Sequence, residues 1–147
     1  MKVREILRLK GGTLYTAAPQ DLLAKASDTM AEFDLGSLVV MENGRMAGML
    51  TFREILKAMQ THAGKLDGMT VGEVMVRNPV VVDPEMDVNI LRSIMIEKHG
   101  RYIPVLDGEL LMGVISFLDV ARAVLEEQHF ENKMLKNYIK NWPDQNA

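Results

Sequence analysis

The sequence predicts a mixed α/β fold (α+β class) in which two β-α-β-β-α repeats stack as a pseudo-twofold module, followed by a C-terminal helix. Three observations support this prediction: the chain repeats itself, each copy shows the same order of strand and helix patterns, and the last segment is amphipathic. Residues 19–59 align with residues 84–124 without a gap, at a constant offset of 65 residues. A copy of about 60 residues buries little surface alone, so we expect the copies to fold against each other.

Each copy opens with a short apolar run that predicts a leading strand, at residues 14–17 and again at 80–82. An amphipathic helix follows in both copies, because apolar residues recur there at helical spacing. These residues are Leu22, Leu23, Ala26, Met30 and Phe33 in the first copy and Val88, Leu91, Ile94 and Met95 in the second.

Two β-rich runs then form a predicted hairpin in each copy, and a second helix closes it. The turns are Glu42-Asn43-Gly44 and Asp107-Gly108, which join residues 37–41 to 46–51 and residues 102–106 to 110–116. The closing helices are expected to run from Phe52 to about Thr61 and from Phe117 to about Gln128. The predicted division is residues 1–62 for repeat 1, 63–69 for the linker, 70–128 for repeat 2, and 129–147 for the C-terminal helix and tail.

The C-terminal segment carries an apolar stripe that something must cover. The stripe consists of Phe130, Met134, Leu135, Tyr138 and Ile139. Packing on its own domain is the preferred expectation, and packing across a homodimer is the alternative.

Composition excludes several classes of protein. The chain of 147 residues has no cysteine, which rules out disulfides, iron–sulfur clusters, thiolate zinc sites and cysteine nucleophiles. A net charge of −3 disfavours nucleic acid as the main partner. The apolar runs are too short to cross a membrane, and the N-terminus lacks the pattern of a secretory signal, so we expect a cytoplasmic location. The three histidines are scattered, so no metal site is predicted.

One motif with chemical content occurs in both copies: a glycine, two apolar residues, a hydroxyl residue, and an acid three positions after the hydroxyl. Its copies are Gly48-Met49-Leu50-Thr51-Phe52-Arg53-Glu54 and Gly113-Val114-Ile115-Ser116-Phe117-Leu118-Asp119. Each lies where a strand meets a helix N-terminus, and such a position favours a bound phosphate.

The same spacing is that of a capping box, in which the hydroxyl and the acid only satisfy backbone donors. This alternative stays open at the level of sequence. Because aspartate is shorter than glutamate, we expect Asp119 to reach back less well and to present its oxygens to a ribose diol.

The chain resembles a CBS (cystathionine-β-synthase) domain pair, and in particular the bacterial stand-alone proteins that contain two such domains. The motifs that carry the resemblance are Val71-Gly72-Glu73-Val74-Met75, Arg101-Tyr102-Ile103-Pro104-Val105 and the Gly113 to Asp119 motif, together with the repeat itself. The resemblance implies one cleft in which Ser116 and Asp119 hold phosphate and ribose. It places Thr16, Ala17 and Ser37 around the base.

The resemblance also implies a second, weaker cleft that departs from the family pattern. Its residues are Thr51, Arg53, Glu54, Val81, Arg101 and Tyr102. Val81 and Tyr102 stand there at the positions of Thr16 and Ser37, while the two arginines are candidates to meet phosphate oxygens.

The predicted function is that of a regulatory, non-catalytic module. It binds an adenine nucleotide between the repeats (AMP, ADP, ATP or NAD, with AMP or NAD preferred) and signals to an effector protein by conformational change. The alternative is a ligand-free structural subunit, a homodimer scaffold whose hydroxyl and acid motifs are only helix caps. For either function we expect a homodimer, because the C-terminal helix is apolar on one side and the resemblance implies twofold dimers. No nucleophile and base pair suggests an enzyme.

Overall fold

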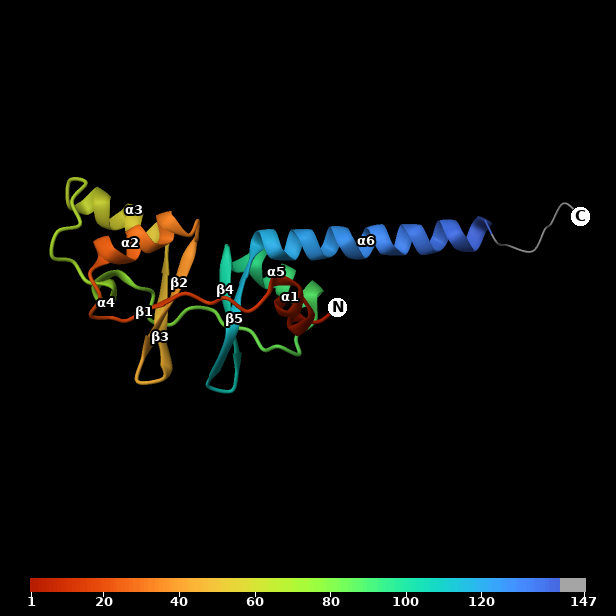
Figure 1. Cartoon of the computed structure of the whole chain (residues 1–147), viewed down its shortest axis with the longest axis horizontal. Coiled ribbons are helices and arrows are strands. Elements are labelled where there is room, and N and C mark those ends of the chain that lie inside the picture. Colours follow the sequence, from red (N-terminus) through yellow and green to blue (C-terminus); the bar gives the residue numbers. More distant parts are fainter. Residues whose placement is uncertain (141–147) are drawn as a thin grey trace, which may run out of the picture.

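The computed structural model describes residues 1–140, and each copy contains the predicted helix, hairpin and closing helix in that order, preceded by a short helix that was not predicted (Figure 1). The first copy supplies α1 (Val3–Lys10), β1 (Thr16–Ala17), α2 (Leu23–Glu32), β2 (Ser37–Glu42), β3 (Arg45–Thr51) and α3 (Phe52–Thr61). The second supplies α4 (Val71–Val74), α5 (Val88–Lys98), β4 (Tyr102–Asp107), β5 (Leu110–Ser116) and α6 (Phe117–Lys140). The predicted fold class of tandem repeats with a C-terminal helix is confirmed.

The internal repeat is reproduced in the strand register. Ser37 pairs with Thr51 and Tyr102 pairs with Ser116, which are equivalent pairs at the 65-residue offset. Both hairpins also shift register at the same point, between Val40 and Met41 in one and between Val105 and Leu106 in the other. The two hairpins lie side by side (Figure 1).

The leading strands are shorter than predicted. β1 comprises only Thr16 and Ala17, which run parallel to β2, whereas the prediction covered residues 14–17. In the second copy the leading strand is reduced to one parallel bridge between Val82 and Val105. A single pair of backbone hydrogen bonds holds it there, from Val82 N–H to the Pro104 carbonyl at 3.1 Å and from Leu106 N–H to the Val82 carbonyl at 3.0 Å.

The two hydrophobic cores do not coincide with the two sequence copies, because the leading helices are exchanged. Val3 and Ile6 of α1 are buried with the residues of the second copy, and Val71 of α4 is buried with those of the first. Matching backbone hydrogen bonds fix each exchange, from Val3 N–H to the Met86 carbonyl and from Val71 N–H to the Asp21 carbonyl, both at 2.9 Å. Neither repeat therefore completes its own core.

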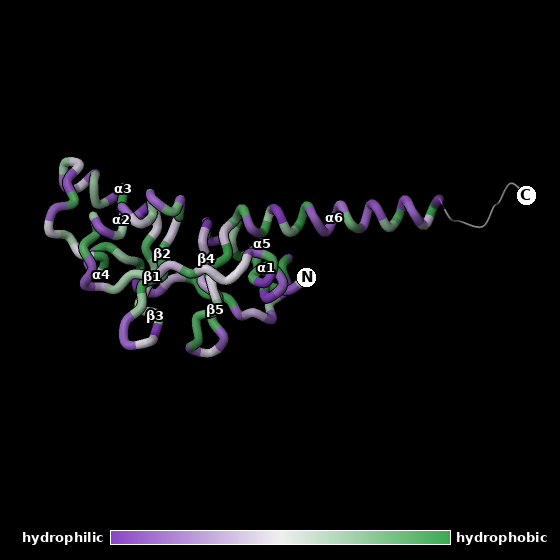
Figure 2. The backbone as a smooth tube through the Cα atoms, viewed as in Figure 1, coloured by the Kyte–Doolittle hydropathy of each residue, from purple (hydrophilic) through white to green (hydrophobic). Residues whose placement is uncertain are grey.

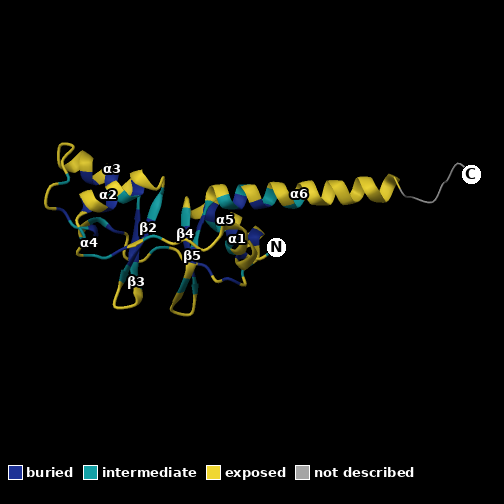
Figure 3. Ribbon diagram, in the orientation of Figure 1, coloured by how far each residue is buried: buried dark blue, intermediate teal, exposed yellow. Residues whose placement is uncertain are grey.

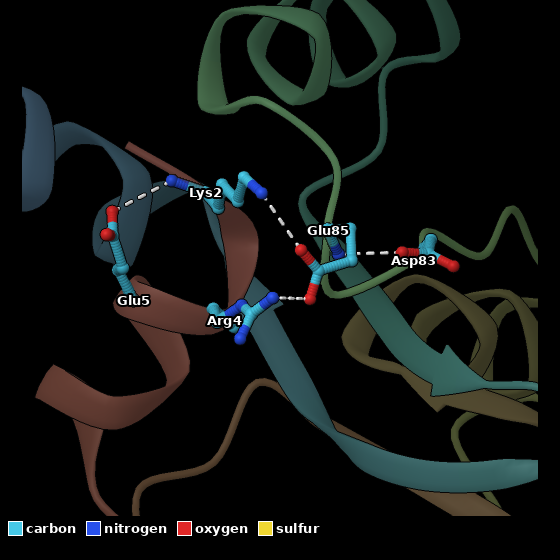
Figure 4. Close-up of polar contacts among 5 residues, drawn as sticks. All are labelled: Lys2, Arg4, Glu5, Asp83 and Glu85. Atoms are coloured by element: carbon cyan, nitrogen blue, oxygen red, sulfur yellow. Dashed lines mark hydrogen bonds and ion pairs between the residues drawn. The ribbon is translucent and has the colours of Figure 1, made fainter.

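Charged side chains attach α1 to the loop before α5 (Figure 4). Glu85 accepts from the Lys2 ammonium at 3.0 Å and from the Arg4 guanidinium, and its backbone N–H donates to Asp83. The Lys2 backbone N–H donates to Glu5, which satisfies a donor at the start of α1. These contacts hold the exchanged helix in one orientation over the second core.

The last helix differs from the prediction in two ways. α6 continues without a break from Phe117 to Lys140, so the boundary expected at residue 128 is not a break in the helix. From Gln128 to Lys140 all its residues are exposed, and the helix projects away from the rest of the molecule (Figures 1 and 3). The expectation that its apolar stripe packs on its own domain is therefore wrong, and residues 141–147 lie outside the described part.

Hydropathy along α6 alternates between apolar and polar positions over its whole length (Figure 2). No helix within residues 1–140 is both long enough and apolar enough to cross a membrane.

Candidate functional site

A cleft of about 1420 Å³ is lined by residues of both copies. The last turn of α1 and the loop after it form one wall, and the start of β2 forms part of another. The ends of α5 and β5 complete the lining, together with the first residues of α6. The strand-to-helix junction that carries Ser116 therefore opens into this cleft, as does Ser37 from the first copy.

At this cleft Gly36 of the first copy lies close to Tyr102 of the second. A Cβ atom at Gly36 would overlap the hydroxyl and Cζ of the Tyr102 ring, so only glycine fits beneath that ring. Tyr102 begins β4 and pairs with Ser116 on β5. This contact thus sets the spacing between β2 of one copy and the Ser116 motif of the other.

Ser116 and Asp119 form a reciprocal cap at the N-terminus of α6. The Ser116 backbone N–H donates to Asp119 Oδ2 at 2.9 Å, and the Asp119 N–H donates to Ser116 Oγ at 3.1 Å. The Asp119 carboxylate accepts from the Ser116 N–H much as Glu54 accepts from the Thr51 N–H, so the expectation that the shorter aspartate would cap poorly is wrong. It uses only one carboxylate oxygen to do so, and Oδ1 has no partner within residues 1–140.

Lys10 holds the same carboxylate from the other copy. Its ammonium lies 2.8 Å from Asp119 Oδ2 and donates to the Val114 carbonyl at 2.7 Å. The Lys10 side chain is 37% exposed and lines the cleft, whereas that of Asp119 is 14% exposed. Asp119 itself is not part of the lining, so its carboxylate lies beside the cleft, in contact with the lining residues Lys10 and Ser116.

These neighbours determine the protonation of Asp119. Burial raises the pKa of its carboxyl group, but the hydrogen bond and positive charge of Lys10 and the hydrogen bonds from Ser116 outweigh burial. The pKa of Asp119 consequently lies below the ordinary value of 3.8, and the group is a carboxylate at neutral pH.

The motif of the first copy is also a capping box, but its hydrogen bonds differ. Glu54 Oε1 accepts from both the backbone N–H and the hydroxyl of Thr51, each at 2.8 Å. The hydroxyl proton of Thr51 is thereby used within the motif. Ser116 Oγ, by contrast, accepts from the Asp119 N–H, and its hydroxyl makes only the smallest of the contributions that lower the pKa of the Asp119 carboxyl group. The two motifs are alike in sequence but differ in what they can offer a ligand.

The other residues expected around the base lie near the cleft at different depths. Ser37 lines it, while Thr16 and Ala17 follow the lining residue Tyr15 on β1. Thr16 is exposed and Ala17 is buried in the first core. Ser37 and Ser116 are thus brought to one cleft, and β1 lies beside them through its pairing with β2.

Arg101 and Tyr102, which the sequence suggested for the second cleft, line the cleft of Ser37 and Ser116. The strand register explains this position, because Tyr102 is the direct partner of Ser116. Thr51, Glu54 and Arg53 are not part of its lining, and Val81 lies in the exposed segment just before the Val82 bridge.

Sequence reasoning missed four basic residues that line the cleft, namely Arg4, Arg8, Lys10 and His99. Arg8 and Lys10 belong to the last turn of α1, and His99 caps the C-terminus of α5 with a left-handed backbone. The one available signal was that Lys10-Gly11-Gly12 has no counterpart in the second copy. Within residues 1–140 no cluster of three or more metal-ligating side chains occurs.

Known proteins with this sequence pattern and fold identify the family. The CBS domain pattern matches residues 3–61 and 71–126. The CBS domain-containing protein YhcV of Bacillus subtilis is 33% identical over 107 residues, which cover 72% of this chain and 75% of YhcV.

The fold agrees with solved structures as well. A CBS-domain protein of Burkholderia ambifaria is 30% identical and superposes with a TM-score of 0.81, covering 87% of this chain and 96% of that one. CBSX2, solved in complex with AMP, is 22% identical with a TM-score of 0.72, covering 86% of this chain and 98% of that one. With both copies matched in sequence and in fold, the chain belongs to the CBS-domain family.

Proposed function

We propose that this protein is a regulatory module that binds an adenine nucleotide in the cleft between its two CBS repeats and signals to a partner protein by conformational change. The cleft has contributions from both copies, so a ligand there would couple their relative positions. CBSX2 has the same fold and was solved with AMP, which makes AMP the first ligand to test. The proposed module performs no catalysis.

The observation that carries the proposal is the hydrogen-bonding capacity left over at the second motif. Asp119 Oδ1 accepts no hydrogen bond in the described chain, the Ser116 hydroxyl interacts only weakly with the Asp119 carboxylate, and Ser116 opens into the cleft. A nucleotide needs a donor for phosphate and a carboxylate for its ribose hydroxyls. We assign these roles to Ser116 and Asp119, and the surroundings of the base to Thr16, Ala17 and Ser37.

The second site remains a weaker proposal. Thr51 and Glu54 would take the motif roles there, yet the Thr51 hydroxyl already donates to Glu54. Val81 offers no hydroxyl to a ligand. We therefore expect occupancy of the Ser116 cleft first.

A ligand-free structural subunit is the second candidate function, and one observation favours it. Both motifs are fully formed capping boxes, so their residues stabilise helix starts without any ligand. This candidate shares with the first the expectation of a homodimer, supported by exposed apolar side chains on α3 and α6. A cytoplasmic location remains a prediction for both.

Native mass spectrometry of freshly purified protein, followed by thermal shift with AMP, ATP and NAD, separates the two candidates. At about one hundred times its dissociation constant a ligand stabilises the native state by about 2.7 kcal/mol, or several degrees in melting temperature. A retained adenine compound or such a shift supports the sensing function. No retained mass and no shift with any of the three would support the ligand-free subunit.

A further inference from the structure

The Lys10 ammonium forms an ion pair with the Asp119 carboxylate, which the proposed function assigns to the ribose hydroxyls. Asp119 Oδ2 already accepts from the Ser116 N–H at 2.9 Å and from Lys10 at 2.8 Å. A carboxylate oxygen has two lone pairs, so both lone pairs of Oδ2 are used in this structure. A ribose diol that places one hydroxyl on each carboxylate oxygen can therefore bind Oδ2 only when Lys10 leaves.

The backbone around Lys10 allows such a movement. Lys10 is the last residue of α1, and Gly11 and Gly12 follow it. A side chain added at either glycine would meet no atom within 4 Å, so this loop is not packed against the rest of the chain. The Ser116 N–H, by contrast, is part of the backbone at the strand-to-helix junction and stays with Asp119.

A displaced Lys10 would be a cation at the wall of the cleft without its carboxylate. Water solvates such a charge in part, and an anion that replaces the lost carboxylate restores the ion pair. Lys10 and the Ser116 N–H bond the same oxygen, so a phosphate that accepts from the Ser116 hydroxyl lies within reach of the ammonium. A nucleotide brings this phosphate, whereas a nucleoside does not.

We propose that Lys10 is a specificity residue that makes binding in this cleft depend on a phosphate group. In this structure Lys10 pairs with Asp119. In the complex Lys10 would pair with the ligand phosphate, and the ribose hydroxyls would bind Asp119 instead. Lys10 thereby favours nucleotides and excludes the corresponding nucleosides by competing for the same carboxylate. This inference rests on the proposed nucleotide-binding function.

Calorimetric titration of AMP and adenosine tests the proposal on the full-length wild type and on Lys10→Met. The quantity that decides is the ratio of the adenosine to the AMP dissociation constant. Wild type should bind AMP far more tightly, and Lys10→Met should lower the ratio about tenfold or more, because adenosine loses its competitor and AMP loses a charged partner. Lys10→Arg keeps the charge and should retain most of the preference.

Lys25→Met is the matched control, since it removes the same charge from an exposed position on α2 outside the lining of the cleft. It should leave both dissociation constants unchanged, and thermal melting confirms that each variant is folded. If the ratio of the adenosine to the AMP dissociation constant is the same in Lys10→Met as in wild type, the proposal is overturned, whether the two affinities fall, rise or stay the same. Wild type that binds none of AMP, adenosine, ATP and NAD overturns the proposed function and this inference together.

Discussion

Asp119 combines a structural and a proposed binding role because its two carboxylate oxygens have different surroundings. Oδ2 is bonded to Ser116 and Lys10, whereas Oδ1 has no partner in the described chain. The choice between capping and binding is therefore not exclusive, since one oxygen serves the cap and the other remains for a ligand.

The Lys10 contact predicts a measurable pH dependence. The pKa of Asp119 should lie below 3.8 in the folded protein, and Lys10→Met should raise it, because burial then acts with less opposition. A depressed folded pKa stabilises the protein above the unfolded pKa of about 3.9, and this stabilisation is lost as pH falls through the folded value. Carboxyl NMR titration measures the pKa directly. A pKa at or above 3.8 in wild type would show that Lys10 does not hold the carboxylate in solution.

Gly36 should be sensitive to the smallest added side chain. In Gly36→Ala the new Cβ would overlap the Tyr102 ring, so the ring or β2 must move, at a cost of about 1–3 kcal/mol in unfolding free energy. Chemical denaturation measures this cost. Gly12→Ala is the control, because no atom lies within 4 Å of its Cβ position and its backbone is not left-handed. Equal stabilities of the two variants would contradict the close approach.

At the residue scale the sequence predicted the Ser116 and Asp119 motif because it recurs at a fixed offset beside a strand end. It did not predict Lys10, because that contact joins residues 109 positions apart through an insertion present in one copy only. Neither periodicity nor repetition carries information about such a contact. The insertion marked the position of Lys10 in the sequence, but Lys10 reaches Asp119 only because α1 packs against the core of the second copy.

At the level of elements, the hairpins and the helices α2, α3 and α5 were predictable, because both copies show the same hydrophobic periodicity and turn residues at equivalent positions. The exchange of α1 and α4 was not, because each has a similar apolar face and the sequence does not say which core covers it. β1 was predicted too long, since Leu14 and Tyr15 are apolar yet have no backbone partner in β2.

The exchange predicts that α1 stabilises the second copy. Ile6 is fully buried among second-copy residues, so Ile6→Ala should lower the unfolding free energy by about 2–5 kcal/mol. Leu9 lies on the same helix but is exposed, so Leu9→Ala should change it by less than about 0.5 kcal/mol. Hydrogen exchange of Ile6→Ala should show the largest loss of protection in β4, β5 and α5. Loss confined to the first copy would contradict the exchanged arrangement.

For the molecule as a whole, the projecting part of α6 needs a partner if its apolar residues are to be covered. Phe130, Met134, Leu135 and Ile139 are each more than half exposed, on the part of the helix that projects away from the rest of the described chain (Figure 3). A helix with this pattern is more often an interface than a free arm, and a second copy is the partner we expect.

Removal of residues 129–147 should therefore leave the fold intact and weaken association. The unfolding free energy should change by less than about 0.5 kcal/mol at concentrations where the protein is monomeric, because residues 129–140 are all exposed and belong to neither core. Sedimentation at micromolar protein should show a dimer for the full chain and more monomer for the shortened one. A full chain that sediments as a monomer at every concentration would contradict the proposed homodimer.

The central claim, that the cleft at Ser116 and Asp119 binds an adenine nucleotide, is tested most directly by titrating AMP into wild type, Asp119→Ala and Glu54→Ala. Loss of hydrogen bonds to a charged group, each contributing about 1.5–3 kcal/mol, should weaken AMP binding to Asp119→Ala about tenfold to several hundredfold. Glu54→Ala removes the equivalent cap from the other motif and should change the affinity less than threefold, or about 0.6 kcal/mol. Equal AMP affinity in wild type and Asp119→Ala would contradict the assigned site.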